Sequence, residues 1–119
     1  MNRFDFQELV ERLPLVVYVD KLDEKSSALY VSPQIAQLLG YSREEWLADA
    51  DLFGNSLHPD DRERVLADVT DRNASGASTT YMDYRLIARD GRVVWVRDEE
   101  MVLHDAEGKP SVAQGYLQD

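Results

Sequence analysis

The chain has 119 residues, a net charge of −10, two histidines and no cysteine. This length suits one domain with a hydrophobic core, and 44% hydrophobic with 30% charged residues is typical of a globular protein. The negative charge argues against binding to nucleic acid or anionic membranes, which need clustered Lys and Arg. The sequence has no signal peptide, no apolar run of about 20 residues and no thiol chemistry, which fits a cytoplasmic domain without membrane insertion.

The first segment has the pattern of an amphipathic helix. Within residues 3–13, apolar side chains recur at helical spacing on one face: Phe6, Leu9, Val10 and Leu13. Pro14 ends the segment, because a residue before proline is biased away from helical angles. We expect residues 1–13 to form an N-terminal cap helix, followed by a domain of residues 14–119.

Two short apolar runs predict a hairpin. Residues 15–19 (LVVYV) and 28–31 (ALYV) are β-branched and aromatic, as strand residues are. Polar residues 23–27 (DEKSS) lie between them and predict the turn.

The next residues carry helix-start signals. Ser32 and Pro33 have the pattern of an N-cap and first helical residue, starting a short helix through Leu39 that Gly40 ends. Another helix then begins with a serine and a glutamate.

Residues 42–45 (SREE) have the sequence of a capping box, in which the serine hydroxyl and the glutamate carboxylate each bond the other's backbone amide. Tyr41 and Trp46 stand where a hydrophobic staple would place them. Residues 49–56 predict a tight polar connection with one helical turn.

The stretch LHPDDRERV at residues 57–65 contains residue types that metal sites and acid/base catalysts also use. Two frames would start a helix here. In one, His58 is the N-cap and Pro59 the first helical residue, so two aspartates fall in the first turn near the helix dipole. In the other, Asp60 is the N-cap and Glu63 its partner. Either frame uses these side chains to start a helix.

This long helix is predicted over residues 59–74, with residues 73–76 (NASG) as its C-cap. Three strand-like segments follow at residues 79–88, 92–104 and 111–118. The order of two strands, helices and three strands predicts an α+β domain. We expect one five-stranded antiparallel sheet with short helices on one face.

The turn at residues 89–91 decides which side chains share a face of the sheet. A three-residue loop ending in a left-handed glycine is favoured over a two-residue loop, because it gives one nearly uniform apolar face. That face holds Tyr84, Leu86, Ala88, Val94 and Val96. The opposite face holds Arg85 and an apolar patch made of Ile87, Val93 and Trp95.

A solvated sheet face rarely keeps such a patch bare. We therefore expect the patch to be covered by the amphipathic helix, by a second copy in a homodimer, or by both. The candidate interface comprises Phe6, Leu9, Val10, Leu13, Ile87, Val93 and Trp95.

Four motifs in order resemble a PAS domain. They are residues 30–53 (YVSPQIAQLLGYSREEWLADADLF), 57–65, 84–98 (YRLIARDGRVVWVRD) and 108–119 (GKPSVAQGYLQD). The chain is closest to the subclass with "HPDD" and "DG…W". The resemblance covers roughly residues 14–119 and implies the same fold. It also implies a sensory and dimerisation module, without catalysis, joined beyond Asp119 to an output domain. A diguanylate cyclase, a phosphodiesterase or a histidine kinase is expected there.

PAS domains bind ligands between the sheet and the long helix. The resemblance implies no flavin or cysteine-linked chromophore, because the reactive cysteine is missing and the flavin-holding positions are apolar: Leu86, Val96 and Leu117. It implies no haem, because residues 60–74 hold no histidine. We therefore expect no cofactor. The candidate pocket is predicted to be lined by apolar and aromatic residues. They are Tyr18, Tyr30, Ile35, Leu39, Trp46, Leu57, Leu66, Val69, Tyr84, Leu86, Val96 and Leu117.

The same residues fit either a packed core or a site for a small apolar ligand, such as an acyl chain. The alternative function is therefore a ligand-free protein-interaction module. The acidic run at residues 98–100 (DEE) is predicted as a solvated strand edge or as a partner of Arg85 or Arg97. We expect no catalytic residue and no metal ligand, because surface carboxylates in a first helical turn have neither burial nor a cleft.

Overall fold

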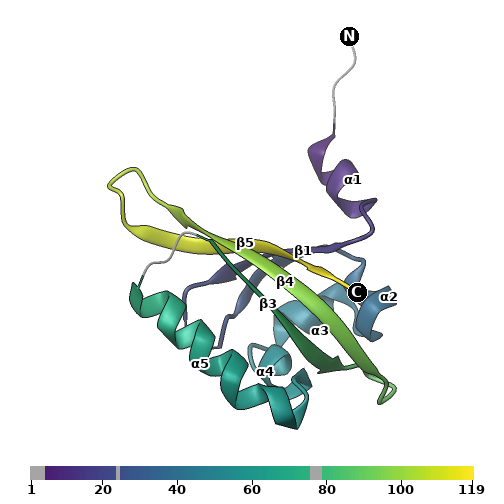
Figure 1. The fold of residues 1–119 in the computed structure, drawn as a ribbon. Coiled ribbons are helices and arrows are strands. Elements are labelled where there is room, and N and C mark those ends of the chain that lie inside the picture. The colour runs from purple at the N-terminus through teal and green to yellow at the C-terminus, as the bar shows by residue number, and fades with distance from the viewer. Residues whose placement is uncertain (1–4, 24, 76–78) are drawn as a thin grey trace.

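The computed structural model describes residues 5–23, 25–75 and 79–119. Its five antiparallel strands stand in the order β2-β1-β5-β4-β3 (Figure 1). They are β1 (Val16–Lys21), β2 (Ala28–Val31), β3 (Thr79–Ile87), β4 (Val93–His104) and β5 (Pro110–Gln118). The predicted α+β class and the five-stranded antiparallel sheet are confirmed.

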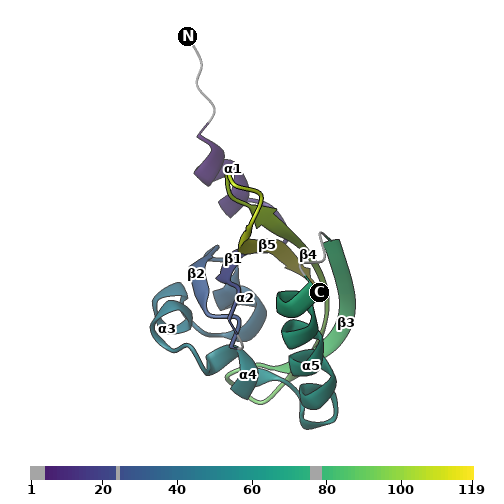
Figure 2. The ribbon, with the colours of Figure 1, turned by 90° about the vertical axis from the view of Figure 1, so that its left-hand side faces the viewer.

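The helices fall into two groups. Four of them lie on one side of the curved sheet, with the 17-residue α5 running across it (Figures 1 and 2). These are α2 (Ile35–Leu39), α3 (Arg43–Ala48), α4 (Leu52–Ser56) and α5 (Pro59–Ser75). The first helix, α1 (Phe6–Glu11), stands apart at one end (Figure 2). No helix in the described residues is long and apolar enough to cross a membrane.

Helix α1 is shorter than the predicted segment 3–13. Its N-cap is Asp5, whose carboxylate accepts a hydrogen bond from the Glu8 amide at 3.2 Å. Arg12 forms its C-cap. Residues 3 and 4 of the predicted helix lie outside the described residues.

The predicted capping box of α3 is confirmed. Ser42 Oγ accepts from the Glu45 amide, and the Glu45 carboxylate accepts from the Ser42 amide, both at 3.0 Å. The predicted staple is also present, with the rings of Tyr41 and Trp46 6.1 Å apart.

The predicted start of α2 is wrong by two residues. The helix begins at Ile35 rather than Pro33, and the Ser32 hydroxyl caps no helix. Instead, Ser32 Oγ accepts a hydrogen bond from the Val17 amide at 2.9 Å. The Ser32 hydroxyl therefore bonds strand β1, although the local sequence predicts that it caps the helix.

His58 resolves the two frames for α5. Its Nδ1 accepts from the Asp60 amide at 3.1 Å, and Pro59 is the first helical residue. The frame with Asp60 as N-cap is therefore wrong. The predicted C-cap at residues 73–76 lies partly outside the described residues, since α5 reaches Ser75 and residue 76 is not described.

The β3–β4 register confirms the three-residue loop. Leu86 pairs with Val94 and Arg85 with Trp95, and Gly91 has a left-handed φ of 90°. Because side chains alternate along a strand, Tyr84, Leu86 and Ala88 face the helices and are almost fully buried. Val93 and Trp95 face away and are 52% and 57% exposed.

Candidate ligand cavity and outer sheet face

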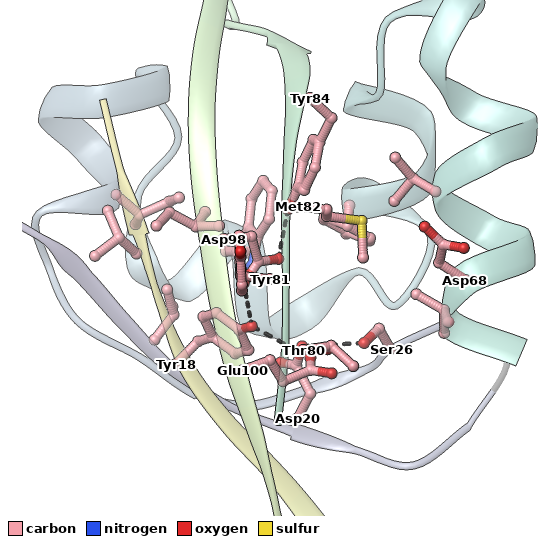
Figure 3. Close-up of a pocket in the computed structure, with 18 of the residues that line it drawn as sticks. Tyr18, Asp20, Ser26, Asp68, Thr80, Tyr81, Met82, Tyr84, Asp98 and Glu100 are labelled. Atoms are coloured by element: carbon pink, nitrogen blue, oxygen red, sulfur yellow. Dashed lines mark hydrogen bonds between the residues drawn. The ribbon is translucent and has the colours of Figure 1, made fainter. Parts of the chain in front are cut away.

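A cavity of about 250 Å³ lies between the inner face of the sheet and helix α5 (Figure 3). All five strands contribute to its lining, together with α2, α3, α4 and α5. Its apolar lining residues are Val16, Val31, Ile35, Trp46, Phe53, Val65, Val69, Met82 and Leu117. Its polar and tyrosine lining residues are Tyr18, Asp20, Ser26, Asp68, Asp71, Thr80, Tyr81, Tyr84, Asp98 and Glu100.

Half of the twelve predicted pocket residues line this cavity. These six are Tyr18, Ile35, Trp46, Val69, Tyr84 and Leu117. Four others are buried in packed core without lining the cavity: Leu39, Leu57, Leu86 and Val96. Leu66 is partly buried and packs against that core. The packed core therefore fills the space next to the β3–β4 turn, and the cavity opens further along the sheet.

Tyr30 lies on the other side of the sheet. Tyr18 pairs with Val31, so Val31 faces inward and its neighbour Tyr30 faces outward. The Tyr30 hydroxyl donates a hydrogen bond to the Glu11 carboxylate of α1 at 3.3 Å.

The sequence prediction missed the carboxylates of the cavity. Asp20 comes from β1, Asp98 and Glu100 from β4, and Asp68 and Asp71 from α5. Because side chains in β4 alternate, the inward position of Val96 already places residues 98 and 100 inward. This alternation was the signal that could have identified two of the five.

The prediction for residues 98–100 as a solvated edge, or as a partner of Arg85 or Arg97, is therefore wrong for Asp98 and Glu100. Both are buried, each 9% exposed. The two arginines instead bind other aspartates: Arg85 pairs with Asp61 at 2.8 Å and Arg97 with Asp83 at 3.0 Å.

Two tyrosine hydroxyls hold the Asp98 carboxylate (Figure 3). Tyr84 donates to it at 2.7 Å and Tyr18 at 2.5 Å, and the Tyr18 hydroxyl also lies 3.2 Å from Glu100. Burial, and then the negative charge of Asp98, raises the pKa of both phenols well above the usual value. Both hydroxyls therefore remain protonated donors at neutral pH.

Gly115 makes room for this arrangement. It pairs with Tyr18 across β1 and β5, and a Cβ atom placed on it would lie 2.5 Å from the Tyr18 hydroxyl. The same Cβ would lie 2.3 Å from the Glu99 carbonyl oxygen. The Tyr18 ring therefore occupies the volume that a side chain at this position would need.

Asp61 connects α5 to strand β3. It is 5% exposed, and its carboxylate accepts three hydrogen bonds from Arg85: from the amide at 2.8 Å, Nε at 2.9 Å and the terminal guanidinium nitrogen at 2.8 Å. These bonds lower the pKa of Asp61 well below its usual range. The first turn of α5 thus depends on a contact between residues 24 positions apart.

None of the described residues covers Val93 and Trp95 of the outer patch, whereas Ile87 is half-buried. The Arg85 guanidinium lies 5.0 Å from the centre of the Trp95 ring, and Trp95 is still 57% exposed. Helix α1 therefore does not cover this patch in the single chain.

Polar contacts hold the end of α1 near β2 and α2 instead. Gln34 Nε2 donates to the carbonyls of Val10 and Leu13, both at 2.9 Å, and Arg43 pairs with Glu11 at 3.3 Å. The apolar Leu9 and Leu13 of the candidate interface are 49% and 42% exposed, Val10 is half-buried, and the Phe6 side chain lies outside the described structure.

The described residues contain no group of three or more histidine, aspartate or glutamate side chains placed to hold a metal ion. The lining of the cavity combines an apolar side with a side of carboxylates and hydroxyls.

The sequence profile of the PAS fold family matches residues 28–117. The chain belongs to this family. It is 27% identical to the N-terminal domain of a diguanylate cyclase with a PAS/PAC sensor from Marinobacter aquaeolei, with a TM-score of 0.78 over 88% of this chain and 94% of that one.

Two curated sensors are also similar. The chain is 31% identical over 116 residues to the two-component sensor PprA of Pseudomonas aeruginosa, covering 95% of this chain and 12% of that protein. It is 24% identical over 115 residues to the methyl sulfide methyltransferase-associated sensor of Methanosarcina acetivorans, covering 97% of this chain and 11% of that one. The chain is a PAS sensory module of the kind found in such signalling proteins.

Proposed function

We propose that this module reports the occupancy of its cavity by a small molecule to an attached output domain, while it is held in a homodimer in the cytoplasm. The observation that carries the proposal is the cavity between the sheet and α5, where apolar side chains face convergent polar groups. Such a pocket is the usual form of a small-molecule site. Its volume of about 250 Å³ lies just below the range of about 300–1,000 Å³ for drug-sized ligands, so a small ligand fits it best.

The diguanylate cyclase and two-component relatives support an output in cyclic di-GMP or histidine kinase signalling. In this proposal the module itself carries no catalysis and no cofactor. It binds no nucleic acid, since its net charge is −10.

The ligand part is tested on the purified protein by mass spectrometry after denaturation, together with an absorbance scan of the folded protein. A small molecule released in stoichiometric amount supports the proposal. A clean spectrum, with no change in the fluorescence of the buried Trp46 across a small-molecule library, would contradict it and favour the ligand-free interaction module.

The homodimer part rests on the outer patch, in which Val93 and Trp95 are exposed and Ile87 is half-buried, and on the exposed Leu9 in α1 and Leu13 after it. A second copy can cover both surfaces at once, because a symmetric dimer presents each surface twice. Trp95→Ala removes the largest side chain of the patch and should weaken the dimer at least about tenfold, as loss of a central aromatic anchor does. Analytical ultracentrifugation over a concentration series measures this change.

Leu47→Ala is the matched control. Leu47 is an exposed apolar residue, 38% exposed, on α3 rather than on the outer sheet face. Equal dimer constants for both variants would show that the patch is not the interface.

A further inference from the structure

We infer that Arg85 is a positioning residue for the proposed homodimer, which holds the indole ring of Trp95 in place and ties that ring to helix α5. This inference rests on the proposed function, since it names a residue that acts on the proposed dimer interface. It follows from two sets of contacts that Arg85 makes, one with α5 and one with Trp95.

The backbone of Arg85 is turned toward α5. Its amide donates to the Asp61 carboxylate at 2.8 Å, and its carbonyl accepts from the His58 amide at 3.0 Å. Because both groups are used in this way, Arg85 and Trp95 form a β3–β4 pair that shares no backbone hydrogen bond. In such a pair the Cα atoms are only about 4.5 Å apart, so the two side chains lie close together on the outer face.

The side chain of Arg85 is held from two sides. The buried Asp61 carboxylate accepts from its Nε at 2.9 Å and from its terminal nitrogen at 2.8 Å. The guanidinium also lies over the Trp95 ring, 5.0 Å from its centre, within the distance of about 6 Å at which a ring face attracts a cation. A planar guanidinium can make both contacts at once, because its edge binds the carboxylate while its face stacks on the ring.

This contact restrains a ring that packing within the chain restrains only weakly, since Trp95 is 57% exposed. Ordering a free side chain at an interface reduces affinity roughly 2- to 10-fold. A ring that is already fixed in the single chain avoids this loss. Because α5 is also a wall of the cavity, Arg85 connects the two parts of the proposed function.

The test is a double-mutant cycle of dimer dissociation constants, measured by analytical ultracentrifugation for the wild type, Arg85→Lys, Trp95→Ala and the double variant. Lysine keeps the charge but cannot bind a carboxylate with two nitrogens and stack as a plane. Arg85→Lys should weaken the dimer about 5-fold or more, because a symmetric dimer contains the contact twice. In the Trp95→Ala background the same substitution should have an effect of less than about twofold.

Arg89→Lys is the matched control. The Arg89 guanidinium lies 5.8 Å from the centre of the Tyr41 ring and pairs with Glu45 of α3 at 2.6 Å. The substitution therefore removes the same kind of double contact on the helix side of the sheet. It should leave the dimer dissociation constant unchanged.

The link to α5 is tested with Asp61→Asn, which removes the charged partner of the guanidinium from a buried position outside the patch. It should weaken the dimer about twofold or more, because the Trp95 ring then loses part of its support. Asp60→Asn, in the same turn of α5, is the control and should have no effect. Circular dichroism shows whether Asp61→Asn is folded, and Arg85→Lys decides the question if it is not.

The failures of the two proposals are distinguishable. If Arg85→Lys leaves the dimer as strong as Arg89→Lys does, or weakens it equally with and without Trp95, the inference is overturned while the homodimer stands. If Asp61→Asn matches Asp60→Asn, the link to α5 is overturned. If the wild type stays monomeric, or Trp95→Ala dimerises like the wild type, the homodimer part of the proposed function fails as well.

Discussion

The two ends of α5 differ in how they meet the sheet. The first turn is fixed by Asp61, whose buried carboxylate binds Arg85 of β3, and the side chains beside it, Leu57 and Leu86, are closely packed. Two to three turns later, Asp68 and Asp71 line a cavity. One helix is thus anchored to the sheet at its start and forms the wall of a cavity further along.

The stability of the protein should fall most when a buried side chain is truncated in the packed core beside the first turn of α5. Leu86 is fully buried and does not line the cavity, so Leu86→Ala should leave a new void and cost about 4 kcal/mol of unfolding free energy. Urea denaturation followed by circular dichroism measures this. A cost below that of Trp95→Ala, on the exposed face, would contradict the observed assignment of faces.

Asp61→Asn should cost about 3 kcal/mol, because charged hydrogen bonds to Arg85 are lost from a buried site. The matched control is Asp60→Asn, which removes the same charge from the same helical turn at a side chain 76% exposed. We expect less than about 0.5 kcal/mol for the control.

Acid should remove the contribution of Asp61. Its pKa is lowered in the folded state, so its contribution is complete above the unfolded pKa of about 3.9 and declines as the pH falls toward the folded pKa. Stability curves measured between pH 6 and pH 2 should therefore converge for the wild type and Asp61→Asn at the acid end. Parallel curves would mean that this carboxylate is not coupled to folding.

Leu117→Ala repeats the leucine truncation at the cavity. Leu117 is 5% exposed and already borders open space, so its loss removes fewer contacts than the loss of Leu86. We expect about 2 kcal/mol, at the low end of the range for such truncations. An equal cost for both leucines would indicate that the space beside Leu117 is closed in solution.

Asp68→Asn should have the smallest effect, less than about 0.5 kcal/mol, since an exposed carboxylate contributes little to stability. Thermal unfolding of the wild type and of Asp68→Asn measures this effect. A large loss of stability would show that Asp68 has a structural role in the fold.

Local patterns predicted most of the fold. The Ser42 capping box, the His58 cap and the Gly91 turn each depend on residues a few positions apart, and the turn fixed the faces of β3 and β4. The assignment of side chains to the inner face of the sheet also predicted apolar residues that line the cavity.

The carboxylates of the cavity were missed for two reasons. A hydrophobic interior was assumed, although the alternation of β4 continued into Asp98 and Glu100. The contact between Asp61 and Arg85 was not visible from a first-turn aspartate alone, because it joins segments that only the folded chain brings together. Where the core ends and the cavity begins depends on how α5 sits on the sheet, which short-range patterns do not specify.

The close approach at Gly115 has a consequence for how such modules diversify. Any side chain at this position would push the Tyr18 ring away from Asp98, and with it one of the two hydroxyl donors that orient that carboxylate. The polarity of the cavity is therefore controlled from a strand position that contributes no side chain at all. A single methyl group on β5 would therefore change the polarity of the cavity, although position 115 is not among the residues that line it.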